Sequence, residues 1–147
     1  MVAAGAAAAI AGGWATGSLL AQVPGFKRVE LQKKDLSIQG REVVQARGEF
    51  EPGAAVPQHT HPGEEIGYVL EGSLELEVAG KPSVTLKAGD AFFVPAETIH
   101  SGKNVGGGST KVLSTYVVEK GKPLATMVKA TAATTPAPSR PARVSAS

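Results

Sequence analysis

The chain has 147 residues, the length of a single domain, and its 15 basic and 13 acidic residues leave a net charge of only +2. That near balance, with the basic residues scattered along the chain, argues against a nucleic-acid-binding protein. Cysteine is absent, which excludes disulfides, thiolate metal sites and cysteine nucleophiles, while 18 glycines and 10 prolines favour a turn-rich all-β domain.

Residues 1–25 contain no charged side chain and consist largely of Ala and Gly. This composition is typical of the apolar region of an export signal, so we expect a periplasmic or secreted protein without stable membrane association after processing. The Lys or Arg that usually precedes such a region is missing. A retained membrane anchor, or an unstructured extension on a cytoplasmic protein, therefore stays open.

Short apolar alternations separated by Gly- and Pro-containing turns predict a β-domain over residues 26–129. Spacings of about 8–12 residues between such strands are typical of a sandwich or barrel. The tail 130–147 has three prolines and little apolar bulk, so it is expected to be disordered. The predicted strands are 29–31, 43–50, 66–70, 74–78, 84–86, 91–94, 99–102 and 112–118.

All three histidines of the chain lie beside predicted strands. His59 and His61 are two residues apart, so on an extended strand they point to the same side. Glu65 follows across the turn-forming Pro62-Gly63, and His100 comes from a distant segment. Three imidazoles and one carboxylate form a suitable ligand set for a divalent metal. The neighbouring Glu64 is the alternative carboxylate ligand.

These residues resemble the two sequence motifs of the cupins. The first motif, G-x5-H-x-H-x(3,4)-E-x6-G, is met by Gly53, His59, His61, Glu65 and Gly72. The second, G-x5-P-x-G-x2-H-x3-N, is met by Gly89, Pro95, His100 and Asn104, with Glu97 where the family usually has Gly. The resemblance spans residues 53–104 and is closest to small single-domain cupins of the conserved-barrel type (cupin 2). It implies a double-stranded β-helix, or jelly roll.

The ligand set does not select strongly among divalent ions when thiolates are absent. We expect Mn or Fe, with Zn, Ni, Cu or Co as possible occupants. Four protein ligands leave one or two positions of an octahedral ion open to substrate or dioxygen, which is typical of a catalytic site.

Other candidate site residues lie outside the ligand set. Glu97 is predicted to occupy a surface turn with an ordinary backbone conformation, and the alternative is an acid or base at the mouth of a pocket. Gln45 and Arg47 share one strand face and are candidate substrate-binding residues, with an outward salt bridge as the alternative for Arg47. Tyr116 is a candidate for the wall of the substrate pocket.

The leading functional hypothesis is a metal-dependent enzyme acting on a small molecule, most plausibly a dioxygenase-like oxidoreductase, with isomerase, decarboxylase and lyase chemistry also open. The alternatives are a non-catalytic metal- or small-ligand-binding barrel and a structural module stiffened by its metal. Ile66, Tyr68 and Leu70 cannot all share the inner face with Glu65, so a homodimer that covers them is expected.

Overall fold

The computed structural model describes residues 23–129, which form ten strands in two antiparallel five-stranded sheets. The predicted export signal over 1–25 falls almost wholly outside the described residues, as does the tail from residue 130. The first sheet contains, in spatial order, β1 (Phe26–Asp35), β2 (Arg41–Phe50), β9 (Thr110–Glu119), β4 (Gly63–Glu71) and β7 (Ala91–Val94). The second contains β10 (Thr126–Met127), β3 (Ala55–Thr60), β8 (His100–Asn104), β5 (Ser73–Val78) and β6 (Val84–Lys87).

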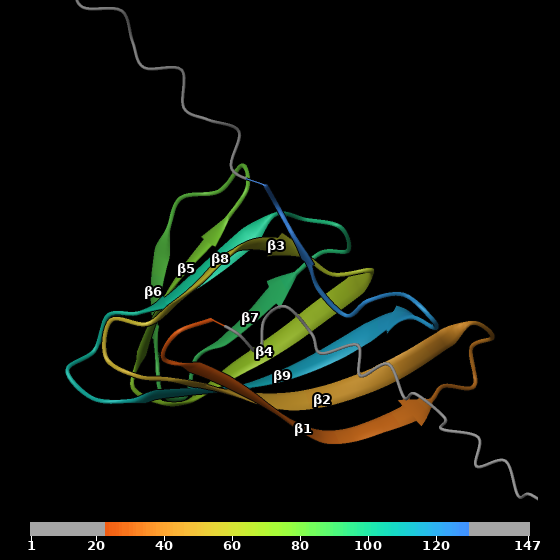
Figure 1. The fold of residues 1–147 in the computed structure, drawn as a ribbon, viewed down its shortest axis with the longest axis horizontal. Helices are drawn as coiled ribbons and strands as arrows, with labels where there is room; N and C mark the ends of the chain where they lie inside the picture. Colours follow the sequence, from red (N-terminus) through yellow and green to blue (C-terminus); the bar gives the residue numbers. More distant parts are fainter. Residues whose placement is uncertain (1–22, 130–147) are drawn as a thin grey trace, which may run out of the picture.

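The two sheets face each other, as Figure 1 shows, and strands adjacent in space are mostly distant in sequence. β2 pairs with β9 and β3 pairs with β8, so the chain alternates between the sheets as it winds. This arrangement is the double-stranded β-helix, and the prediction of an all-β jelly roll is confirmed. No helix within residues 23–129 is long and apolar enough to cross a membrane.

The core lies between the sheets because burial alternates residue by residue along the long strands. Successive side chains of a strand point to opposite faces, and along β2 and β9 every second residue is buried. The buried apolar side chains of these two strands are Val44, Ala46, Phe50, Val112, Tyr116 and Val118. Polar side chains interrupt this apolar interior on β3, β4 and β8, and that is where the candidate site lies.

Asn104 fixes the end of β8, the strand that begins with His100. Its side chain is 1% exposed, and the two N–H groups of its amide are shared among the carbonyl oxygens of Phe50, Glu51 and Gly108. Its side-chain oxygen accepts hydrogen bonds from the Gly106 N–H and the Thr110 hydroxyl. A buried polar network of this kind is stable only when every member is satisfied, so Asn104 ties two loops to one strand.

Glu97 departs from the turn conformation predicted for it. Its φ is 55°, which places it in the left-handed region, where it is the one non-glycine residue among residues 23–129. The expectation of an ordinary backbone at this position is therefore wrong. The Glu97 N–H donates to the carbonyl oxygen of His61, at 3.0 Å, and this bond holds the strained turn against a histidine of the candidate site.

Candidate metal centre

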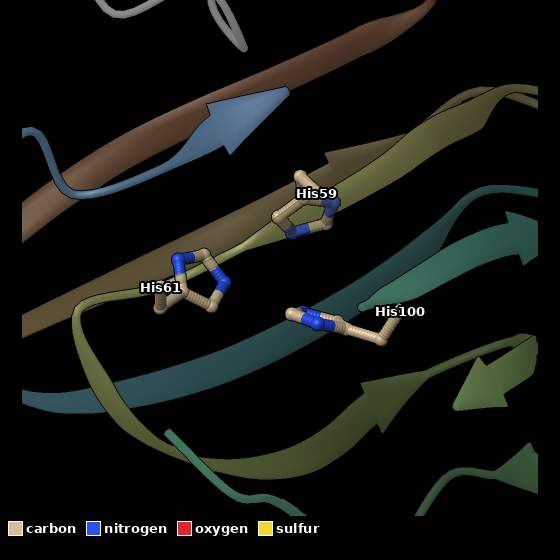
Figure 2. A group of neighbouring side chains, drawn as sticks. All are labelled: His59, His61 and His100. Carbon is tan, nitrogen blue, oxygen red and sulfur yellow. The ribbon is translucent and has the colours of Figure 1, made fainter. Parts of the chain in front are cut away.

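The three histidine rings converge from two strands and a connecting segment, as Figure 2 shows. His59 lies on β3, His61 follows the end of that strand, and His100 begins β8. Register pairing places His59 directly opposite His100. The ring centroids are 4.2 to 5.0 Å apart, and each residue is 6% exposed or less. One ligand atom from each ring lies within 4.8 Å of the others, so the cluster can hold one metal ion.

Backbone carbonyl groups orient all three rings. The Nδ1 atoms of His59, His61 and His100 lie 2.8, 2.6 and 2.8 Å from the carbonyl oxygens of Pro57, Leu124 and Thr98 respectively. A carbonyl oxygen only accepts hydrogen bonds, so each Nδ1 must carry the proton and donate it. The Nε2 atoms of the neutral rings are then left with lone pairs. This is the tautomer that a metal ligand needs when it coordinates through Nε2.

Glu65 brings a carboxylate to the same point from the inner face of β4. Its Oε2 lies 3.1 Å from His100 Nε2 and 3.2 Å from His61 Nε2, and its Oε1 accepts a hydrogen bond of 2.7 Å from the Ser114 hydroxyl. Burial raises the pKa of this carboxyl, and the hydrogen bond from the Ser114 hydroxyl lowers it. With Nδ1 protonated in both rings, the Nε2 atoms of His61 and His100 have no proton to donate, so their lone pairs face the carboxylate and a cation between them would satisfy all three groups.

The spacing and the unsatisfied groups at this point fit a divalent ion. Two donors bound at about 2.1 Å to one ion, at right angles, lie about 3.0 Å apart, close to the two Glu65–histidine distances. His61 Nε2 is buried and has no hydrogen-bond partner in the described part of the chain, despite its closeness to Glu65. Burial and the neighbouring His100 lower the pKa of His59 to about 4, so its ring is neutral at pH 7 and available as a ligand.

A cavity of about 60 Å³ adjoins the cluster inside the barrel. His59, Glu65 and His100 line its polar end together with Ser114 and Tyr116. Burial raises the pKa of the Tyr116 phenol, and the nearby Glu65 raises it further, so this hydroxyl stays protonated and can donate a hydrogen bond. The apolar wall is formed mainly by Phe26, Phe50, Val56, Leu74, Leu76 and Phe92.

The other sequence-predicted residues lie elsewhere. Arg47 is on the outer face of β2 and forms an ion pair of 2.7 Å with Glu49, and Gln45 on the same face bonds the side chains of Gln32 and Thr115. Neither lines the cavity. Glu97 is exposed and does not line it either. Glu64 points away from Glu65, as alternation along a strand requires.

Ser114 and Arg28, which both line the cavity, were not predicted as site residues from the sequence. Ser114, which fixes the Glu65 carboxylate, lies between the alternating apolar residues of β9, where a small polar residue on the buried face was the available signal. Arg28 lines the cavity from β1, although its sequence neighbourhood shows only a basic pair, Lys27-Arg28. The carbonyl of Leu124 that orients His61 carries no sequence signal at all, because any residue supplies it.

Comparison with known protein families gives one domain match. Residues 46–116 match the family model described as a cupin domain, and this range includes His59, His61, Glu65 and His100. Among curated proteins, the chain is 34% identical over 106 residues to germin-like protein subfamily 2 member 2 of Arabidopsis thaliana, covering 69% of this chain and 43% of that protein. The chain thus spans less than half the length of this relative.

Among the solved structures that resemble this fold, two have similar TM-scores and the same sequence identity. KdgF from Halomonas sp. has a TM-score of 0.56 and 26% identity, over 66% of this chain and 83% of that one. A recombinant oxalate oxidase in complex with glycolate has a TM-score of 0.59 and 26% identity, over 76% of this chain and 60% of that one.

Proposed function

The chain belongs to the cupin superfamily through its domain at residues 46–116, and on that premise we propose that it is a metal-dependent oxidoreductase acting on a small organic molecule. The observation that carries the proposal is the convergence of three imidazole rings and the Glu65 carboxylate beside a cavity inside the barrel. The likeness to an oxalate oxidase and to a germin-like protein supports the oxidoreductase class.

In this proposal His59, His61, Glu65 and His100 hold one divalent ion, for which Mn or Fe is proposed ahead of Zn, Ni, Cu and Co. When bound, such an ion polarises substrate oxygen atoms and offers open positions for small molecules. The residues of the chain supply the rest. Carbonyl groups hold the rings, Ser114 orients the carboxylate, and the Tyr116 phenol donates a hydrogen bond to a substrate oxygen atom.

A second candidate function is a non-catalytic barrel that binds a metal or a small ligand. One observation favours it: Glu65 is the only carboxylate that lines the cavity within residues 23–129, and the proposed metal already claims it. No uncommitted general base is therefore at hand in that part of the chain. Catalysis would then depend on the ion and on the substrate's own acidity.

Metal analysis followed by oxygen-uptake assays tests the proposal. The full-length protein is purified without added metal, its bound ions are identified by elemental analysis, and oxygen consumption is measured with oxalate, glycolate and small enols. Metal-dependent oxygen uptake that disappears in His61→Ala supports the oxidoreductase. Tight metal binding with no turnover on any substrate, but with ligand-linked thermal stabilisation, would instead support the binding barrel.

Two further proposals concern the surroundings of the barrel. A second copy of the chain covers the outer face of β4 and β7, where Ile66, Tyr68 and Phe93 are 49%, 45% and 53% exposed. Ile66 and Phe93 are register partners, so the three side chains form one apolar patch. The composition of residues 1–25 supports export, as argued above. No nucleic-acid partner is proposed.

A further inference from the structure

Arg28 reaches the interior of the barrel from β1, the edge strand of the first sheet. Its register partner on β2 is Gly48, which lies between the buried residues Ala46 and Phe50 on the inner face. Paired residues of adjacent strands project to the same face, so Arg28 points inward. It lines the same cavity as His59, Glu65 and His100.

The guanidinium group of Arg28 lacks a counter-ion. Its Nη1 atom is buried and has no hydrogen-bond partner among residues 23–129, and no carboxylate in that range lies within ion-pair distance. Glu65, the one acid in the cavity, is occupied by Ser114, His61 and His100. Arg28 as a whole is half-buried, but a guanidinium nitrogen that is buried without a partner is costly, and such a group in a cavity points to a ligand that completes it.

We propose that Arg28 is the anchor for the carboxylate of a small organic acid whose other polar end reaches the His59–His61–Glu65–His100 cluster. This inference deepens the proposed function and rests on it for the role of the cluster. Arginine is suited to the task because its planar fork binds a carboxylate through two parallel hydrogen bonds. An arginine and a divalent ion facing one carboxylate leave the cavity with an excess of positive charge, which an anion neutralises.

The size of the cavity limits the ligand. One water needs about 10–15 Å³ of such space, so 60 Å³ admits roughly four to six non-hydrogen atoms. This is the size of a two- or three-carbon acid. Phe26, Phe50 and Phe92 line the apolar wall, so among the lining residues the charged groups of the ligand find charged partners only at Arg28 and at the histidine–Glu65 cluster.

Nuclear magnetic resonance of the full-length protein tests the anchor directly. The side-chain Nε–H signal of Arg28 is assigned by its loss in Arg28→Met, and acetate is titrated into both the metal-free and the zinc-loaded protein. We expect acetate to shift this signal, the neutral isostere acetamide to leave it in place, and Arg28→Met to weaken acetate binding at least about tenfold. Arg47→Met, on the outer face, is the matched control and should bind acetate normally.

A second variant distinguishes loss of the anchor from misfolding of Arg28→Met. Arg28→Lys keeps the charge, loses the planar fork, and should bind acetate with intermediate affinity. Equal affinity for acetate in the wild type and Arg28→Met, or an equal response to acetamide, overturns the anchor. The outcomes for the two proposals are distinguishable: zinc binding without an acetate shift leaves the metal centre standing and removes the anchor. An acetate shift at Arg28 in a protein that holds neither zinc nor any of the other proposed ions leaves the anchor standing and removes the metal centre.

Discussion

His59 and His100 are direct register partners on β3 and β8, with their ring centroids 4.2 Å apart, although 40 residues separate them in the sequence. This pairing joins the two halves of the site across one pair of strands. It also makes the position of each ring dependent on the strand register, because a slip by one residue would turn His100 to the outer face of the sheet.

Glu65→Gln should reduce metal affinity at least about tenfold. Mutating a residue that only hydrogen-bonds a metal ligand typically lowers metal affinity about 10–100-fold, and the Glu65 carboxylate is proposed to bind the ion directly. The matched control is Glu64→Gln, one residue along β4 on the opposite face. Elemental analysis and metal titration of both variants provide the measurement. Normal metal content in Glu65→Gln, or loss of metal in Glu64→Gln, would move the carboxylate ligand to another residue.

Acidification should destabilise the metal-free protein through His59. Burial and the nearby His100 lower its pKa from 6.5 to about 4, so between these pH values the unfolded chain takes up a proton that the folded chain does not. Stability therefore falls as the pH falls through this window, by about 2 kcal/mol between pH 7.5 and pH 5. Urea denaturation at both pH values measures the change. His59→Gln should flatten this part of the profile, and an unchanged slope in that variant would assign the effect elsewhere.

Asn104→Leu should destabilise the protein by about 3 kcal/mol or more, because it leaves several buried backbone groups without partners in place of a satisfied network. The m-value of urea unfolding should stay the same. Ser101→Ala, on the same strand as Asn104, is the control. It removes a single exposed hydrogen bond to Glu77 of β5 and should change stability by less than about 0.5 kcal/mol. A small effect of Asn104→Leu would mean that water replaces the amide.

Glu97→Gly should stabilise the protein, because glycine adopts a φ of 55° without the penalty that a side chain carries there. A side chain in the left-handed conformation costs the folded state about 1–2 kcal/mol, and glycine removes this cost. Glycine also makes the unfolded chain more flexible, which offsets about half of the gain, so the expected increase in stability is about 0.5–1 kcal/mol. Glu97→Ala keeps the penalty and serves as the control. Thermal unfolding of both variants is the measurement, and turnover of Glu97→Gln separately tests an acid or base role for this residue.

Replacing the outer-face patch should separate a dimer into monomers. The double variant Ile66→Lys and Phe93→Lys places two positive charges in the proposed dimer contact, where each would be buried without a partner. Ile38→Lys is the control, since Ile38 is 63% exposed and lies in the turn between β1 and β2. Sedimentation velocity distinguishes the species. A wild-type protein that sediments as a monomer at high concentration would remove the proposal.

Strands with an apolar inner face could be predicted from the sequence. The alternating apolar residues at 74–78 and 112–118 correspond to β5 and β9. In β5 the apolar residues Leu74, Leu76 and Val78 are buried, and in β9 every second residue is buried. β3 was not among the predicted strands, since Pro57, Gln58 and His59 replace the apolar alternation with a proline and polar side chains. β1 extends well beyond the predicted 29–31, because an exposed edge strand has little inner face to reveal.

The candidate site was predictable to the extent that its residues lie near one another in the sequence. His59, His61 and Glu65 could be grouped by spacing, whereas His100 was added as the one remaining histidine of the sequence, and the resemblance to a known motif then supported it. Gln45 and Arg47 were candidates for the interior, but they lie on the outer face of β2, and Arg47 forms the outward ion pair that was the alternative for it. The inward orientation of Arg28 follows from its pairing with Gly48.

The carbonyl groups of Pro57, Thr98 and Leu124 have a consequence for protein engineering. Because the protonation of each imidazole is dictated by main-chain atoms, side chains around the histidines can be redesigned freely without exchanging one tautomer for another. A library that varies the cavity wall could thus alter the choice of ligand while the electronic state of the three donors persists.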